Sequence, residues 1–137
     1  MSAALYLIDT SALFRIFDGD VRDAWSDAVG EGVIAVCPVV ELEFLYSARS
    51  LADRLEKQEL MRDLFSWVSM HEGAYERASE VQQRLTETGQ HRSAGAVDLL
   101  IAATAEHERL VILSDDHVYR TVATVTGQAV RFVTDRA

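Results

Sequence analysis

The chain contains a single cysteine, Cys37, and a single proline, Pro38, among its 137 residues. One thiol cannot form an internal disulfide, so a hydrophobic core has to stabilise the fold, and a chain of this length can build one. With 49% hydrophobic residues, the composition excludes a disordered chain. No apolar run reaches roughly 18 residues and no basic leader precedes the first apolar stretch, so we expect neither a membrane span nor a signal peptide. We therefore expect one cytoplasmic domain over residues 1–137.

Positive charge is also scarce. The chain has 13 Lys and Arg against 22 Asp and Glu, a formal net charge of −9, and Lys57 is its sole lysine. A passive nucleic-acid binder normally carries an excess of basic residues, so this balance argues against that class. The balance leaves open a site in which carboxylates bind a divalent cation.

Three short aliphatic runs, at 5–8, 33–36 and 110–113, predict strands that are buried on both faces, as in a parallel sheet. Weaker strand patterns lie at 67–70 and 129–133. The apolar spacing between the runs predicts helices over 11–17, 21–29, 38–46, 51–65, 74–88, 97–107 and 115–126. Strands that alternate with helices indicate an α/β fold, with a mostly parallel sheet flanked by helices.

Acidic residues follow two of the predicted strands. Asp9 comes directly after the first run, and Asp115 and Asp116 follow the run at 110–113 after one residue, Ser114. Sites in open α/β sheets lie at the carboxyl ends of the strands, and neighbouring strands are roughly 4.8 Å apart, so carboxylates on adjacent strands can share one ion. Such oxygen ligands suit Mg²⁺ or Mn²⁺ better than Zn²⁺. The ordinary alternative is that Asp9 and Ser114 only cap the helices that follow.

Further acids lie in apolar surroundings. Asp98 is the only charged residue between Arg92 and Glu106. A buried carboxylate needs a partner, although an acid in the first turn of a helix is also favoured by the helix dipole. Glu41 and Glu43 lie two residues apart on a predicted helix, so their side chains point to nearly opposite sides and at most one faces a site. Spacing alone does not choose between them.

Four segments, in order, resemble the motifs of PIN-domain nucleases. Residues 7–13, LIDTSAL, are similar to the opening motif, and residues 43–48, EFLYSA, resemble the segment E-L-L-Y-G-A. Residues 98–103, DLLIAA, match D-x-x-I-A-A, and residues 112–119, ILSDDHVY, resemble L-T-x-D-x-D-F. The order of the motifs and the chain length are most similar to the VapC toxins of bacterial toxin–antitoxin modules.

The resemblance implies a five-stranded parallel sheet and a metal-dependent ribonuclease. It also implies a homodimer that a cognate VapB-like antitoxin inhibits, in a heterotetramer or a larger assembly. The resemblance identifies Glu43, rather than Glu41, and Asp116, rather than Asp115, as the acids of the functional site. The chain departs from the last motif at Val118, which replaces a second acid. Whether one or two metal ions bind therefore stays open.

We hypothesise that Asp9, Asp98 and Asp116 bind Mg²⁺ or Mn²⁺ directly or through water. Glu43 would orient or deprotonate the attacking water, or bind a second ion. Hydrolysis by an activated water would leave a 5′-phosphate and a 3′-hydroxyl. We expect supporting roles, as hydrogen-bond partners near the ion or the scissile phosphate, for Thr10, Ser11, Ser114 and Asp115.

RNA still has to approach an acidic protein. Arginine suits bidentate phosphate contacts, and the candidates for RNA contact are Arg15, Arg49, Arg54 and Arg92. Because sequence-specific RNA recognition usually targets unpaired loops, we expect a loop of transfer or ribosomal RNA as the substrate. The residues expected to meet a partner helix are Trp25, Phe44, Tyr46, Leu60, Leu64 and Trp67.

Other classes place acids at strand ends as well. A phosphoacceptor receiver domain needs a lysine near its last strand, and no lysine follows Lys57. A haloacid-dehalogenase-type phosphatase needs an acid two residues after its nucleophile, where this chain has Ser11. The alternative that stays open is a nuclease-like module with a weakened site, which acts by binding RNA or a partner.

Overall fold

The computed structural model describes residues 3–135, in which five parallel strands form one sheet in the order β3-β2-β1-β4-β5. The strands are β1 (Tyr6–Ile8), β2 (Ile34–Val36), β3 (Ser66–Trp67), β4 (Val111–Ser114) and β5 (Val130–Phe132). The helices of the described residues are α1 (Thr10–Arg15), α2 (Gly19–Gly30), α3 (Pro38–Leu45), α4 (Leu51–Leu64), α5 (Ala74–Glu87), α6 (Ala96–Glu108) and α7 (Val118–Thr126). The predicted fold class is confirmed.

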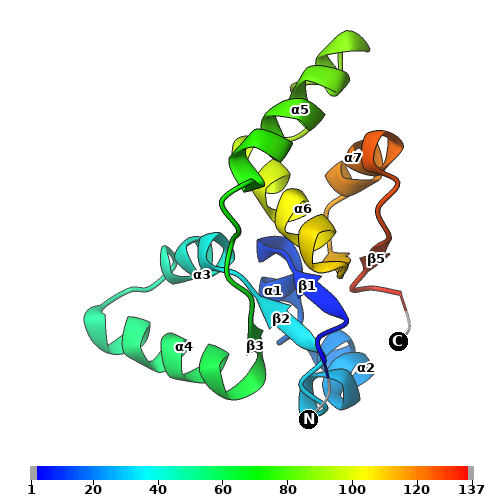
Figure 1. Ribbon diagram of the computed structural model, residues 1–137. Helices are drawn as coiled ribbons and strands as arrows, with labels where there is room; N and C mark the ends of the chain where they lie inside the picture. The colour runs from blue at the N-terminus through cyan, green and yellow to red at the C-terminus, as the bar shows by residue number, and fades with distance from the viewer. Residues whose placement is uncertain (1–2, 136–137) are drawn as a thin grey trace.

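The direction in which the sheet grows reverses beside β1. From β1 the chain adds β2 and β3 on one side, and then crosses to add β4 and β5 on the other. Because such crossovers are right-handed, α1 to α4 cover one face and α5 to α7 the other. Figure 1 shows α5, α6 and α7 together in the upper part of the view and α2 and α4 in the lower part. Strands β1 and β4 pair with Ile8 opposite Leu113. Ligands of open α/β sheets bind at this kind of switch point, at the carboxyl ends of the strands.

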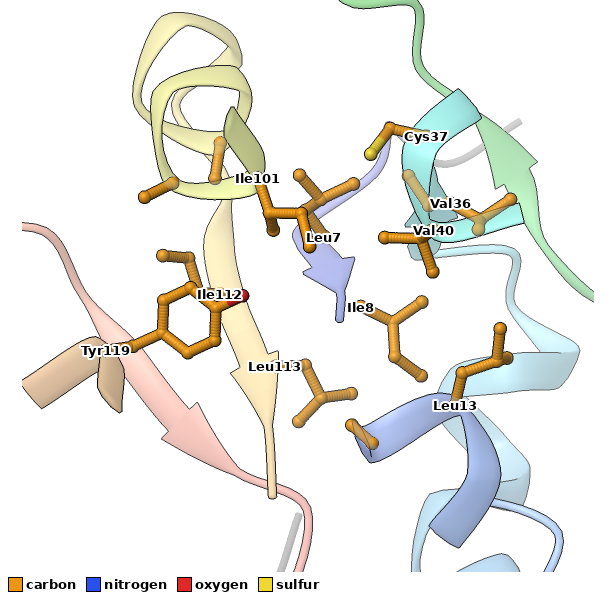
Figure 2. Packing of buried hydrophobic residues seen from close by; sticks show 14 of the residues in the cluster. Leu7, Ile8, Leu13, Val36, Cys37, Val40, Ile101, Ile112, Leu113 and Tyr119 are labelled. Carbon is orange, nitrogen blue, oxygen red and sulfur yellow. The ribbon is translucent and has the colours of Figure 1, made fainter. Parts of the chain in front are cut away.

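The core is built on the two central strands. Leu7 and Ile8 of β1 and Ile112 and Leu113 of β4 are all fully buried, so both faces of these strands are covered by helices. Figure 2 shows these side chains between α6 on one side and α1 and α3 on the other. Burying a leucine or isoleucine side chain stabilises a fold by roughly 1.5–3 kcal/mol, so this part of the sheet is a firm base for side chains that follow it.

Local chemistry explains several helix ends. Pro38 occupies the first turn of α3, where a missing N–H group is harmless. Gly127 ends α7 with a φ of 71°, in the left-handed region that favours glycine. The predicted capping role of Ser114 was wrong: Ser114 lies inside β4, and His117 begins α7 without a side-chain cap. The hydroxyl of Ser114 is instead used at the sheet edge, as described below.

Two predictions about apolar residues need correction. Trp25 and Phe44, expected to meet a partner helix, are buried in the core. Trp25 also donates from Nε1 to the carbonyl of Val133 at 2.7 Å, so α2 is fixed to the end of the chain beyond β5. The leucines at the start of α4 lie outside the core, because Leu51 is 70% exposed and Leu55 56% exposed. Within residues 3–135 no helix is both long and apolar enough to cross a membrane.

Candidate functional site

Asp9 lies where β1 ends and α1 begins, and its carboxylate is buried, with a residue exposure of 3%. Its Oδ1 accepts the N–H of Ala12 at 2.8 Å, so the capping role is confirmed. Its Oδ2 accepts the hydroxyl of Ser114 at 2.8 Å. Burial raises the pKa of Asp9 above its usual range, although the hydrogen bonds from Ala12, Ser114 and Ser11 oppose this shift. Asp9 is therefore both the N-cap of α1 and a buried carboxylate at the carboxyl end of β1.

Two serine hydroxyls connect Asp9 to the end of β4. Ser11 donates to both carboxylate oxygens of Asp9 at 2.9 Å and accepts the N–H of Asp115 at 2.9 Å. Ser114, fully buried, donates to Asp9 and accepts the N–H of Asp116 at 2.9 Å. The turn after β4 is thus fixed against the end of β1 by hydroxyl groups. Both serines were predicted as supporting residues, and the structure places both beside Asp9.

Glu43 reaches the same region from α3. The hydroxyl of Thr10, the residue after Asp9, donates to Oε1 of Glu43 at 2.5 Å. Helices α1 and α3 pack against each other, so this bond fixes an otherwise exposed carboxylate beside Asp9. Glu41 accepts no comparable bond among the described residues. The structure therefore brings Glu43, rather than Glu41, to the carboxyl end of β1.

Asp98 lies in the first turn of α6 and interacts with all three other acids. Its Oδ2 accepts the N–H of Gly95 at 3.0 Å, which satisfies the start of the helix. Burial raises its pKa, and the nearby charges of Asp116 and Glu43 raise it further. The charge of Asp98 in turn raises the pKa of Asp9. Asp98 is thus the electrostatic centre of the four acids, and the cost of holding their charges together is relieved when a cation binds.

Asp116 and Asp115 follow β4 but differ in their contacts. Asp116 is exposed, and its Oδ1 accepts the N–H of Val118 at 3.0 Å. Asp115 forms an ion pair with Arg15, with 3.2 Å between Oδ2 and Nη1. Asp116 is therefore the acid of this turn that interacts with Asp98, whereas the charge of Asp115 is compensated by α1.

Tyr119 is part of the site and was missed by sequence reasoning. It belongs to α7, is fully buried, and its hydroxyl lies 3.5 Å from Oδ1 of Asp98. Burial raises the pKa of Tyr119 well above its usual value, and the charges of Asp9, Asp98 and Asp116 raise it further, so the hydroxyl stays protonated. An aromatic residue at a helical core position ordinarily indicates packing alone, which is why the spacing gave no indication of this contact.

The donor set fits a hydrated divalent cation. Every acid at the site offers carboxylate oxygen, and Asp9 is buried next to hydroxyl and amide donors that orient it. As arranged, no three His, Cys, Asp or Glu side chains of the described residues could hold a metal ion by themselves. Mg²⁺ usually keeps several water molecules and binds proteins through one or two carboxylates, so such an ion would be bound partly through water.

The four arginines predicted to contact RNA lie on different elements or turns of the fold. Arg15 is the one whose contacts reach the site, because it pairs with Asp115 and also with Asp18. Arg49 lies in the exposed turn between α3 and α4, and Arg54 lies in the first turn of α4. Arg92 is exposed in the turn before α6. Their role in RNA binding stays a prediction.

Comparison with known proteins gives one consistent family. The PIN domain profile matches residues 6–125. Ribonuclease VapC21 of Mycobacterium tuberculosis is 36% identical over 128 residues, which cover 93% of this chain and 93% of that protein. Ribonuclease VapC2 of the same species is 33% identical over 139 residues, covering 99% of this chain and 97% of that protein.

Solved structures share the fold at lower identity. A chain of the DNA-bound VapBC complex from Salmonella typhimurium superposes with a TM-score of 0.75 at 18% identity, covering 95% of this chain and 98% of that one. At this identity the likeness bears on the fold alone. The five-stranded parallel sheet with its flanking helices is the architecture that the two chains have in common.

Proposed function

This chain belongs to the PIN-domain family and, within it, to the VapC ribonucleases, and from this premise we propose that it is a metal-dependent endoribonuclease and the toxin of a type II toxin–antitoxin module. The observation that carries the proposal is the electrostatic coupling of Asp9, Glu43 and Asp116 through Asp98 at the switch point of the sheet. Helix capping accounts for single backbone bonds of Asp9 and Asp98, but it does not require four acids at one sheet edge, and such a group suits a divalent cation.

We assign Asp9, Asp98 and Asp116 as ligands of Mg²⁺ or Mn²⁺, directly or through water. Such an ion, when bound, neutralises charge on a phosphodiester and lowers the pKa of water. The hydroxyls of Ser11 and Ser114 hold Asp9 in place, and the N–H of Gly95 holds one oxygen of Asp98. These bonds fix the first ligands before any substrate arrives, which is the requirement for a site that has to act on a positioned phosphate.

Glu43 is assigned to the attacking water. The hydroxyl of Thr10 occupies its Oε1, which leaves Oε2 free of any partner among the described residues and able to accept a proton. Attack in line with the leaving 3′-oxygen gives a 5′-phosphate and a 3′-hydroxyl. A metal-independent ribonuclease that used the 2′-hydroxyl of the RNA as the nucleophile would instead leave a cyclic phosphate, so the product ends distinguish the two mechanisms.

The substrate is proposed to be an unpaired loop of a structured RNA, such as transfer or ribosomal RNA, in the cytoplasm. The chain has a net charge of −9, so phosphate contacts have to be local, and Arg15, Arg49, Arg54 and Arg92 are proposed to supply them. Two copies of the chain would bring two sets of these arginines together, and a homodimer is the proposed active form.

The antitoxin is proposed to cover an exposed apolar surface that we call the α4 face, formed by Leu51 and Leu55, which lie one turn apart on α4. On the other side of α4, Leu60 lines a pocket of about 340 Å³ together with Phe14, Phe17, Phe44 and polar residues of α4. Isolated exposed leucines need no explanation, but two of them on the same side of one helix support a binding surface there. The acidic chain favours a partner segment that is apolar on one side and rich in arginine.

The test is RNA cleavage by the purified protein, freed of any antitoxin. Total RNA is incubated with Mg²⁺ or Mn²⁺, with and without a chelator, and the cut ends are mapped. We expect cleavage that leaves 5′-phosphates, requires the cation and is lost in Asp9→Asn. Cleavage that survives both the chelator and Asp9→Asn would overturn the metal site.

A second function is favoured by one observation, that Val118 stands where the resembled motif has an acid. A site with one fewer acid could bind RNA or a partner without cleaving. The same experiment distinguishes this alternative, because a binding module would retain RNA at every cation concentration and leave it intact.

A further inference from the structure

The hydroxyl of Tyr119 is directed at one oxygen of one acid. Tyr119 is fully buried on α7, and Figure 2 shows its ring beside β4 with the oxygen turned into the core. Its one hydrogen bond among the described residues goes to Oδ1 of Asp98, at 3.5 Å. The other oxygen, Oδ2, accepts the N–H of Gly95 at 3.0 Å. Each oxygen of Asp98 thus has its own donor.

A hydroxyl in this position needs a reason. A buried ring contributes to packing without any polar atom, and phenylalanine would fill the same space. Burying a hydroxyl without a partner is unfavourable, so the hydroxyl of Tyr119 is useful only through its bond to Asp98. The motif that residues 112–119 resemble ends in phenylalanine, so the polar atom is a feature of this chain.

The contact joins two elements of the site. Asp98 is carried by α6, whereas Tyr119 follows Asp116 by three residues in the segment that begins α7. A bond between Tyr119 and Asp98 therefore sets how the carboxylate of Asp98 is turned relative to the segment that carries Asp116. This relationship matters because Asp98 and Asp116 repel each other until a cation binds.

We propose that Tyr119 is a positioning residue, whose hydroxyl holds Oδ1 of Asp98 turned toward Asp116 and so raises the affinity of the site for a divalent cation. The inference rests on the proposed function, because it assumes that these acids bind the ion. Groups that orient metal ligands in this way typically change metal affinity 10–100-fold when they are removed.

The test is Mn²⁺ binding by the full chain without RNA, followed by electron paramagnetic resonance. In Tyr119→Phe we expect the Kd for Mn²⁺ to rise about 10-fold, with an unchanged circular dichroism spectrum. Tyr6→Phe is the matched control, because it removes a hydroxyl that accepts a 2.7 Å bond from Arg131 away from the site. We expect its Kd to equal that of the wild type.

A double-mutant cycle separates positioning from general loosening of the core. In an Asp98→Asn background, Tyr119→Phe should not weaken Mn²⁺ binding further, because the oxygen that Tyr119 orients no longer belongs to a charged ligand. A Kd for Tyr119→Phe within twofold of the wild type would overturn the inference and leave the proposed function intact. An equal loss of Mn²⁺ affinity on Tyr119→Phe in the wild type and in the Asp98→Asn background would overturn the inference as well. A wild-type protein that binds no Mn²⁺ would overturn both.

Discussion

The hydroxyl of Ser114 donates a 2.8 Å hydrogen bond to Oδ2 of Asp9, which connects the ends of the two central strands, β4 and β1. The bond lies at the switch point of the sheet, between two strands whose central side chains are fully buried. Its surroundings cannot shift without disturbing the core, so Asp9 is held in place by the packing of the two central strands. The proposed chemistry thus depends on a ligand whose position the fold itself determines.

Ser114→Ala should impair both stability and cleavage. The substitution leaves Oδ2 of Asp9 with one fewer donor in a buried site, and a lost hydrogen bond to a buried charged group lowers the free energy of unfolding by about 1–3 kcal/mol. Urea denaturation measures this loss, and an RNA cleavage assay measures the expected drop in rate. Ser79→Ala, an exposed serine of α5, is the control that should change neither quantity.

Asp98→Asn should abolish cleavage but stabilise the metal-free protein. Burial and the charges of Asp116 and Glu43 raise the pKa of Asp98 in the folded state, so its ionised form is unfavourable there. Neutral asparagine avoids that repulsion and still accepts the bond from Gly95. Thermal unfolding with a chelator at pH 7 should give a higher Tm for Asp98→Asn than for the wild type, and Asp63→Asn should leave the Tm unchanged.

The difference in Tm between Asp98→Asn and the wild type should change with pH in one defined direction. A carboxyl whose folded pKa is raised favours folding below its unfolded pKa, near 3.8, and this contribution is lost as the pH rises through the folded value. The Tm of Asp98→Asn minus that of the wild type should therefore be close to zero at pH 3 and grow as the pH rises toward neutral. A difference that shrinks over this range would contradict the assignment.

Leu51→Asp and Leu55→Asp should weaken antitoxin binding at least tenfold without affecting RNA cleavage. Both leucines lie on the α4 face and are more than half exposed, so a charge there does not disturb the core. Isothermal titration calorimetry with the cognate antitoxin gives the affinity. Leu5→Asp is the matched control, because Leu5 is 54% exposed but lies before β1, away from that face. Unchanged affinity in both α4 variants would place the antitoxin elsewhere.

The sequence allowed the sheet and the acids to be predicted because both follow from short-range patterns. Strands buried on both faces are continuously apolar, and an acid just after such a strand lies at the sheet edge, which located Asp9 and the pair Asp115 and Asp116. The choice of Asp116 over Asp115 came from resemblance to known motifs. The choice of Glu43 over Glu41 came from resemblance to known motifs, since helical spacing placed the two side chains on opposite sides. The hydrogen bond from Thr10 gives that choice a physical basis.

Long-range contacts explain what could not be predicted. A serine after a strand has the same local pattern whether it caps a helix or bonds across the sheet, and only the pairing of β1 with β4 brings Ser114 to Asp9. Apolar residues on a helix have the same spacing whether the domain covers them or not. Trp25 was therefore wrongly expected at an interface, while the leucines of α4 were found exposed.

The most direct test of the central claim compares two glutamates of one helix. The single-turnover rate of RNA cleavage is measured against Mg²⁺ concentration for the wild type, Glu43→Gln and Glu41→Gln. We expect saturable, cation-dependent cleavage in the wild type and in Glu41→Gln, and a rate at least 100-fold lower in Glu43→Gln, in the range that general base catalysis contributes. Equal rates for the two variants, or cleavage that does not depend on the cation, would contradict the central claim.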